Sequence, residues 1–239
     1  MARTDLSKRQ GVNRIMADLT IVVGSKNYSS WSLRPWLALK QTGAAFEEIL
    51  IHLDDPNKVA LIRAHSPAGK VPVLTHGAVT VWESLAICEY LAEMFPEAKL
   101  WPEDRAARAH ARAVASEMHA GFSNLRTHLS MNIHGRSTRA RDRSNLTPET
   151  WADITRIVEL WDDCRRRFGA GGPFLFGVFT NADAMFAPVV TRLRTYQVPL
   201  PSSAREYCDA VWTLPAMQEW AAAAKSEPAI SRYDVSLTA

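Results

Sequence analysis

The sequence predicts an α/β domain followed by an all-helical bundle domain, and three observations lead to this fold class. Short β-branched runs alternate with helical patterns up to residue 97, whereas the periodic segments after residue 105 all have the helical period. The chain has 239 residues and 47% hydrophobic content, which is enough for two cores of ordinary size. We therefore expect an α/β domain over 18–97, a linker over 98–105 and an all-helical domain over 106–239.

Residues 1–17 are polar and basic, and they lack the apolar segment of a secretory signal. We expect this stretch to be a disordered extension. Because Met16 lies close to the start of the predicted fold, translation from Met1 or from Met16 is left open.

Composition indicates neither a nucleic-acid partner nor a membrane. The formal net charge is only +3, from 28 basic and 25 acidic residues, and no apolar run approaches the roughly 20 residues of a membrane span. The three cysteines are far apart and form no Cys-x-x-Cys motif, so neither a disulfide framework nor a metal site is expected. Free cysteines favour a reducing compartment, and we expect a cytoplasmic protein.

The first elements form a βαβ unit. Leu19–Val23 is a short β-branched run that reads as a buried strand, and Phe46–Leu53 alternates as a second strand parallel to it. The helix between them ends at Gly43, and Pro35 favours Ser32 as its N-cap, because proline is comfortable only in the first turn. On this interpretation Ser29 and Ser30 lie in the loop with free hydroxyls.

A second pair of strands is predicted at Val71–Leu74 and Val79–Trp82, joined by a turn over 75–78. Pro72 lies between two valines and cannot donate a ladder hydrogen bond, so we expect an edge rather than a central strand. An extended peptide could then pair with the backbone of Val71.

Glu83–Ser84 begins the next helical pattern, and a helix start offers free amides to an anion. These residues and the proline-containing run together predict a site for a small, anionic, peptide-like ligand. The element order of this half, strand, helix, strand, short helix, two strands and helix, is that of a thioredoxin-type domain.

The second half is predicted as helices. One long helix is expected from Arg105 to about Leu129, followed by an arginine-rich segment over 132–145 that we interpret as a solvated loop rather than an anion or nucleic-acid patch. The remaining predictions are a helix from Thr147 to Phe168, a buried helix begun by a capping box at Thr180 and Asp183, and two closing helices over 203–212 and 215–225.

Three motifs in this order resemble the cytosolic glutathione transferases, most nearly a serine-type, zeta-like bacterial member. They are Ser66-Pro-Ala-Gly-Lys-Val-Pro-Val-Leu74, Glu83-Ser84-x-Ala86-Ile87 and Phe179-Thr-Asn-Ala-Asp183. The resemblance implies glutathione as co-substrate, with a cis Pro72, backbone hydrogen bonds from Val71 to the cysteinyl unit, and Glu83 with Ser84 at the γ-glutamyl end. Lys70 pairs with the glycyl carboxylate or is simply a solvent-exposed lysine, and we weigh these two equally.

The catalytic hydroxyl implied by the resemblance belongs to the segment Asn27-Tyr-Ser-Ser-Trp-Ser-Leu-Arg34. Alignment to different classes of the family places the key position on Asn27, Ser29 or Ser30. We favour Ser29, then Ser30, with Tyr28 as a further candidate. A hydroxyl that donates to sulfur at the positive end of a helix lowers the pKa of a bound thiol from about 8.5 towards neutrality.

The function implied is that of a glutathione transferase of the detoxification type, which adds the thiolate to a small hydrophobic electrophile. We expect this electrophile between the domains, near residues that would otherwise be ordinary core: Trp31, Trp36, Met118, His119 and Phe122. One alternative is a zeta-like cis-trans isomerase of the maleylacetoacetate type, using arginines to hold carboxylates, and another is a non-enzymatic glutathione-binding or interaction protein. The resemblance also implies a homodimer.

Overall fold

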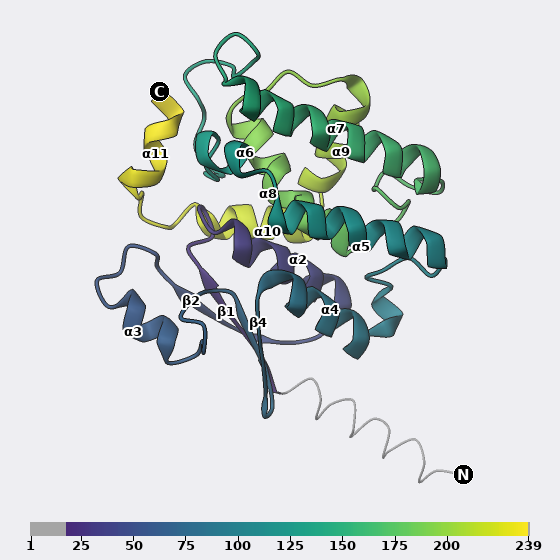
Figure 1. The fold of residues 1–239 in the computed structure, drawn as a ribbon. Coiled ribbons are helices and arrows are strands. Elements are labelled where there is room, and N and C mark those ends of the chain that lie inside the picture. Colours follow the sequence, from purple (N-terminus) through teal and green to yellow (C-terminus); the bar gives the residue numbers. More distant parts are fainter. Residues whose placement is uncertain (1–17, 239) are drawn as a thin grey trace.

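The computed structural model describes residues 18–238, which form a small sheet domain beside a larger helical assembly (Figure 1). The first half of the chain contains β1 (Leu19–Gly24), α2 (Ser30–Thr42), β2 (Glu47–Ile51), α3 (Lys58–Arg63), β3 (Val73–His76), β4 (Val79–Trp82), α4 (Ser84–Met94) and the short η1 (Pro96–Ala98). The predicted order is confirmed. The exact domain limits stay predictions, and the extension expected over 1–17 lies outside the described residues.

The sheet has the strand order β2-β1-β3-β4, with β1 parallel to β2 and the other neighbours antiparallel. Alternate residues of β1 face opposite sides, because side chains in a strand have a period of two. Ile21 packs in the large core with α2 and α4, whereas Val22 and Val73 form a smaller cluster with Ile62 of α3. This arrangement confirms the thioredoxin-type fold.

The edge position predicted for the proline-containing strand is wrong. β3 lies between β1 and β4, and its ladder begins at Val73, after Pro72. Because the proline precedes the ladder, its missing N–H costs no strand pairing. The strand continues to His76, opposite Val79, so the hairpin turn is shorter than predicted.

The N-cap predicted for α2 is also wrong. Ser29 is the cap, and α2 already begins at Ser30. Pro35 therefore lies inside the helix rather than in its first turn. The hydroxyl of Ser32 instead accepts a hydrogen bond from the backbone N–H of Gly24 at 3.0 Å, which ties the helix to the end of β1.

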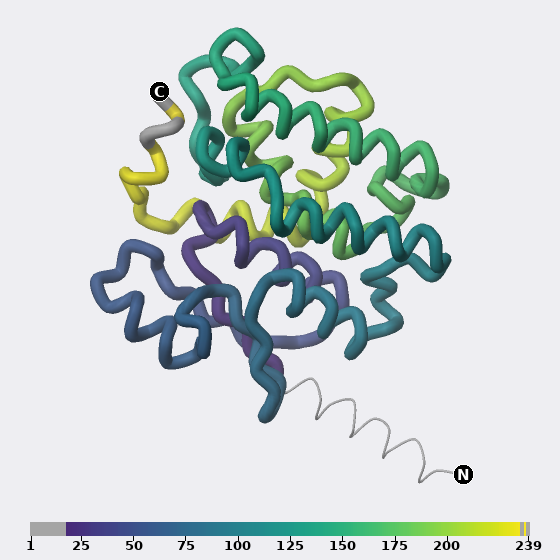
Figure 2. The backbone as a smooth tube through the Cα atoms, viewed as in Figure 1, coloured from purple at the N-terminus to yellow at the C-terminus, as the bar shows by residue number. Residues whose placement is uncertain are grey.

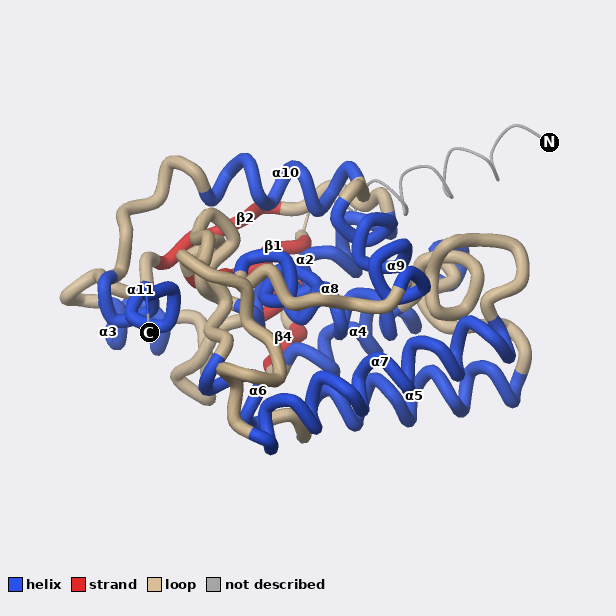
Figure 3. The backbone as a smooth tube through the Cα atoms, turned by 90° about the horizontal axis from the view of Figure 1, so that it is seen from above, coloured by secondary structure: helices blue, strands red, loops and turns tan. Residues whose placement is uncertain are grey.

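Seven helices are described in the second half, and Figure 2 traces how they follow the sheet domain along the chain, with the C-terminal segment coming back beside it. They are α5 (Arg105–Ala120), α6 (Ser123–His128), α7 (Pro148–Phe168), α8 (Asn181–Thr195), α9 (Ser202–Trp212), α10 (Pro215–Ala224) and α11 (Ser231–Thr238). Figure 3 shows α5 and α7 running side by side, and α11 at the same end of the molecule as α3. The described part of the chain contains no helix long and apolar enough to cross a membrane.

α8 is buried along most of its length, as its apolar sequence predicts, and it also packs against α2 of the first half. Its capping box is present, and the buried Asp183 carboxylate accepts hydrogen bonds from the backbone N–H groups of Thr180 and Leu175, the Thr180 hydroxyl and the Tyr207 hydroxyl. Across the two halves, the Arg34 guanidinium donates to the carbonyl of Met185 at 3.1 Å. The helical half is therefore joined to α2 through buried contacts.

Two expectations for the helical half need correction, and one helix was missed. The long helix from Arg105 breaks after Ala120, because Phe122 has a φ of 62° in the left-handed region, and α6 starts anew. The loop over 132–145 is partly buried rather than solvated, since the backbone N–H groups of Ser137 and Arg141 donate to carbonyls at the end of α8. α11 was not predicted.

Candidate functional site

The expected ligand-binding residues surround one cavity of about 160 Å³. Its lining comes from α2, the loop before β3, the end of β4 and the start of α4. The lining residues are Trp31, Ala68, Lys70, Val71, Pro72, Trp82, Glu83 and Ser84. The five residues predicted to hold glutathione thus lie together at one end of the sheet.

The Val71–Pro72 peptide bond is cis, as the resemblance implies. Val71 lies outside the β-ladder, so strand pairing does not use its N–H and C=O. The preceding turn is held by Ser66, whose hydroxyl accepts from the N–H of Lys70 at 3.1 Å and donates to its carbonyl at 2.7 Å. The backbone of Val71 is therefore presented to the cavity by a fixed loop.

Glu83 and Ser84 form the start of α4. Glu83 occupies the N-cap position with a φ of 71°, a left-handed conformation that costs a non-glycine residue free energy. Ser84 is only 1% exposed, and its hydroxyl has no hydrogen-bond partner in residues 18–238. A buried hydroxyl without a partner is costly, and here it lies at the positive end of a helix. A ligand carboxylate could accept a hydrogen bond from this hydroxyl, and the positive end of the helix would stabilise its charge.

The two candidate serines differ in what their hydroxyls already contact. Ser29 donates to the Ser32 hydroxyl at 2.8 Å and accepts from the Ser32 N–H at 3.4 Å, so its hydroxyl is not free as predicted. Its role as N-cap explains this difference. The hydroxyl of Ser30 has no hydrogen bond within the described chain, and Ser30 is the first residue of α2.

Tyr28, the further candidate, directs its hydroxyl towards the C-terminal segment. It donates to Asp234 at 3.2 Å and accepts from the N–H of Ile230 at 2.9 Å. Burial raises the pKa of the Tyr28 phenol, so this hydroxyl stays protonated at neutral pH.

A second cavity of about 410 Å³ adjoins the first, and Trp31, Lys70 and Val71 line both. Its apolar and aromatic lining includes Leu53, Ile62 and Met131. The full lining is Tyr28, Ser29, Ser30, Trp31, Leu53, Ile62, Gly69, Lys70, Val71, Arg126, Ser130, Met131, Arg192 and Tyr233. Both candidate serines line this second cavity and not the first.

Only Trp31, of the five residues expected near the electrophile, lines this second cavity. Trp36, Met118 and Phe122 are buried in the large core, and the Trp36 indole donates to Glu48 at 2.6 Å. His119 lines neither cavity but contacts Trp31 edge-on, with its Nε2 3.9 Å from the Glu83 carboxylate. Burial and the charge of Arg34 lower the pKa of His119.

Two arginines of the second cavity were missed by sequence reasoning. Arg126 comes from α6 and Arg192 from α8. The signal that could have found Arg192 is its place in a helix predicted to be buried, because a buried guanidinium needs a partner or a ligand. Arg126 carries no such signal, since the break before α6 was not predicted.

Arginine charges converge around Trp31. The guanidinium carbons of Arg34 and Arg126 lie 4.3 Å and 4.7 Å from the centroid of its ring. Burial, followed by the charges of Arg126 and Arg192, holds the pKa of Arg34 well below its usual value. Burial and the charge of Arg126 lower the pKa of Arg192 to about 10. The wall of the second cavity is therefore strongly cationic.

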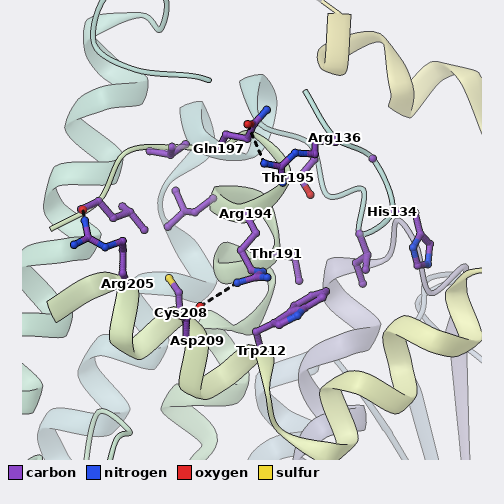
Figure 4. A pocket seen from close by; sticks show the side chains of 15 residues that line it. His134, Arg136, Thr191, Arg194, Thr195, Gln197, Arg205, Cys208, Asp209 and Trp212 are labelled. Carbon is purple, nitrogen blue, oxygen red and sulfur yellow. Dashed lines mark hydrogen bonds and ion pairs between the residues drawn. The ribbon is translucent and has the colours of Figure 1, made fainter. Parts of the chain in front are cut away.

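A separate cavity of about 500 Å³ lies between α8, α9 and the loop after α6 (Figure 4). It shares no lining residue with the other two. Its polar groups are already paired: Arg194 donates to Asp209 at 3.1 Å and Arg136 donates to Gln197 at 2.9 Å. It is larger than the predicted site but contains none of the predicted site residues.

Within residues 18–238, no group of three or more histidine, cysteine or acidic side chains lies close enough together to hold a metal ion. The three cysteines are buried and free. Burial raises the pKa of Cys88 to about 12, so this thiol is not a nucleophile at neutral pH.

Comparison with known proteins identifies what the chain is similar to. The family model described as "Glutathione S-transferase, N-terminal domain" matches residues 28–94. A probable maleylacetoacetate isomerase from Caenorhabditis elegans is 36% identical over 96 residues, 40% of this chain and 44% of that relative. Glutathione S-transferase omega-1 from Mus musculus is 27% identical over 216 residues, 90% of this chain and 80% of that relative.

Solved structures share the fold over most of the chain. A glutathione transferase homologue from Burkholderia, with bound glutathione, has a TM-score of 0.66 at 23% identity and covers 88% of this chain and 100% of that one. A maleyl pyruvate isomerase, described as a bacterial zeta-class glutathione S-transferase, has a TM-score of 0.67 at 23% identity with the same coverage.

Proposed function

We propose that this chain, which matches the glutathione S-transferase N-terminal family model over residues 28–94, is a glutathione S-transferase that binds glutathione in the 160 Å³ cavity and transfers its thiolate to an electrophile in the adjoining 410 Å³ cavity. The observation that carries the proposal is the unpartnered, buried hydroxyl of Ser84 at the start of α4. Together with the unpaired backbone of Val71, it offers what an anionic peptide needs.

In the proposed arrangement, glutathione lies extended along the backbone of Val71 and Pro72, just before β3. Its cysteinyl unit exchanges hydrogen bonds with the N–H and C=O of Val71. The γ-glutamyl carboxylate takes the hydroxyl and the N–H of Ser84, and its ammonium faces the exposed Glu83. Lys70 lines both cavities and would pair with the glycyl carboxylate.

The thiol then lies at the N-terminus of α2, where the helix dipole favours an anion. Its proton leaves to solvent, and a serine hydroxyl donates a hydrogen bond to the thiolate. We place Ser30 first for this role because its hydroxyl has no other contact, and Ser29 second because its hydroxyl already caps the helix. The thiolate forms the S–C bond, and the leaving group departs with its electron pair.

The first experiment is retention on immobilised glutathione, followed by calorimetric titration with glutathione. A protein that binds, and that conjugates a halonitroarene faster than solution glutathione alone, supports the proposal. A folded protein that shows no binding would instead support the alternative of an interaction protein that kept the fold without the chemistry.

A cis-trans isomerase of small diacids is the second candidate function. It is supported by the named activities of two relatives, a maleylacetoacetate isomerase and a maleyl pyruvate isomerase. An isomerase adds the thiolate to a double bond and later expels it, so glutathione is not consumed. Measuring glutathione consumption with maleylacetone as substrate separates the two functions.

We further propose that the protein acts as a cytoplasmic homodimer. Three buried, free cysteines support a reducing compartment. β4 is an edge strand with the exposed side chains of Val79 and Trp82, which supports an association through this edge. Sedimentation of the full chain would test the dimer.

A further inference from the structure

Trp31 lines both the 160 Å³ cavity and the 410 Å³ cavity. Its side chain is 37% exposed, so its indole can meet a ligand directly. The indole N–H groups of Trp36, Trp101 and Trp220 donate to protein oxygens, whereas the N–H of Trp31 makes no hydrogen bond within residues 18–238. A free hydrogen-bond donor is therefore carried by a side chain that borders both cavities.

Two guanidiniums lie over the ring of Trp31. The guanidinium carbon of Arg34, from the same helix, is 4.3 Å from the ring centroid, and that of Arg126, from α6, is 4.7 Å away. Each guanidinium is itself held by the backbone, since Arg34 donates to the carbonyl of Met185 at 3.1 Å and Arg126 donates to that of Gly121 at 3.0 Å. The orientation of the indole is thus fixed before a ligand binds.

The charges over Trp31 are uncompensated, unlike the charge over a comparable tryptophan. Arg194 lies 4.6 Å from the ring centroid of Trp212, and its guanidinium is paired with Asp209 at 3.1 Å. Within residues 18–238, neither guanidinium over Trp31 forms an ion pair with a carboxylate. A positive charge against an indole withdraws electron density from the ring and makes its N–H a stronger donor. The free N–H of Trp31 therefore favours an acceptor that carries negative charge.

The proposed reaction creates negative charge on the co-substrate as well as on sulfur. When the thiolate attacks an electron-poor carbon, the S–C bond forms and a π electron pair moves onto a nitro or carbonyl oxygen. The pair then returns and expels the leaving group or, in an isomerase, the thiolate. In the arrangement proposed above, the serines donate to sulfur, and Lys70 and Ser84 bind the carboxylates of glutathione, so none of these groups serves that oxygen. It needs a donor that is fixed in place beforehand.

We propose that Trp31 is a catalytic residue, whose indole N–H donates a hydrogen bond to the co-substrate oxygen that becomes negative as the thiolate adds. The inference rests on the proposed function, and it applies to conjugation and to isomerisation alike. The proton stays on the indole nitrogen throughout, so the step needs no acid or base partner. The co-substrate class that follows is an electrophile conjugated to a nitro or carbonyl group, rather than an alkyl halide, whose charge leaves with the halide.

The compound 1,3,5-trinitrobenzene isolates the charged species. It accepts the thiolate but has no leaving group, so the coloured addition complex, with its charge on the nitro oxygens, persists. The formation constant of this complex is measured by absorbance on the full chain saturated with glutathione. Trp31→Phe keeps an aromatic ring but has no N–H. We expect it to lower the formation constant by about tenfold or more, the usual effect of a hydrogen bond to a charged group.

Controls separate this effect from a structural one. Trp212→Phe changes another tryptophan that has an arginine over its ring, in the separate 500 Å³ cavity, and should leave the formation constant unchanged. In Trp31→Phe, the affinity for S-methylglutathione and the pKa of the bound glutathione thiol should change little. Because phenylalanine is smaller than tryptophan, Trp31 is also replaced site-specifically by 3-benzothienylalanine, which keeps two fused rings and has sulfur in place of N–H. It should show the same loss.

Turnover tests the substrate class. In Trp31→Phe, kcat/KM for 1-chloro-2,4-dinitrobenzene should fall by about tenfold or more. With 1-iodobutane the negative charge leaves with the iodide, so kcat/KM should change by less than about twofold. A wild type that does not turn over the iodide at all would agree with the same substrate class.

The outcomes distinguish the inference from the proposed function. If glutathione binds, but both replacements of Trp31 keep the formation constant within about twofold of the wild type, the inference is overturned and the proposed function stands. A loss that is equally large in the binding of S-methylglutathione also overturns the inference, because it indicates a structural defect. If the wild type does not bind glutathione, both are overturned.

Discussion

The hydroxyl of Tyr28 donates a hydrogen bond to the carboxylate of Asp234 over 3.2 Å. The rings of Tyr28 and Tyr233 also stack, with centroids 5.1 Å apart. The C-terminal segment thus rests on the loop that precedes α2 and contributes Tyr233 to the wall of the second cavity. The far end of the chain therefore helps to shape the site built by its beginning.

Tyr28→Phe should loosen this segment. The variant loses the hydrogen bonds to Asp234 and Ile230, which together contribute about 1–2 kcal/mol. Amide hydrogen exchange of residues 227–238 should accelerate about fivefold or more. Tyr90→Phe is the matched control, because its hydroxyl contacts His76 away from this segment. Equal exchange in Tyr28→Phe and the wild type would contradict the contact.

Ser84→Ala should act in opposite directions on stability and on binding. The unliganded protein should be as stable as the wild type or slightly more stable, because a buried hydroxyl without a partner is removed. Glutathione should bind about tenfold more weakly. Ser66→Ala is the contrasting variant. The buried Ser66 hydroxyl is hydrogen-bonded to both the N–H and the C=O of Lys70, so its removal should make the protein less stable. Unchanged glutathione affinity in Ser84→Ala would show that this hydroxyl does not bind glutathione.

Asp183 predicts a pH dependence of stability. Burial raises its pKa to about 6, against an ordinary value of 3.8. Between these values the native state binds more protons than the unfolded state, so the free energy of unfolding falls as pH rises through this window, by at most about 3 kcal/mol. Urea unfolding of wild type and Asp183→Asn at about pH 4 and about pH 7 isolates the effect. The wild type should exceed Asp183→Asn in free energy of unfolding by more at the lower pH than at the higher pH. A difference that is the same at both pH values, or larger at the higher one, would contradict the raised pKa of Asp183.

Local signals predicted the fold well where one physical cause dominates. The β-branched run at 19–23, the Thr147 cap and the Thr180–Asp183 capping box each determine their element through short-range hydrogen bonds or burial. The predictions failed where tertiary contacts determine the local backbone conformation. Pro35 is accommodated inside α2, and the helix that begins at Arg105 ends at Gly121, where the next residue, Phe122, takes a left-handed conformation.

In the candidate site, too, the part that depends on local motifs could be predicted and the part that depends on tertiary packing could not. The proposed glutathione side comes from three stretches, at 29–31, 66–72 and 83–84, and could be proposed from motifs alone. The electrophile side could not, because Arg126, Arg192 and Tyr233 meet only through the packing of α6, α8 and the C-terminal segment. Periodicity identifies buried faces but does not show which buried residue borders a cavity.

The measurement that tests the central claim most directly is the pKa of the thiol of bound glutathione, followed by thiolate absorbance during a pH titration of the complex. We predict a pKa of about 7 or lower, against about 8.5 for a free thiol. Ser30→Ala should raise this value by about one unit or more, with little loss of stability, whereas Ser29→Ala should also destabilise α2 by about 1 kcal/mol. A bound thiol that keeps a pKa near 8.5 in the wild type, or a lowered pKa that survives in the Ser29→Ala/Ser30→Ala double variant, would contradict the proposed mechanism.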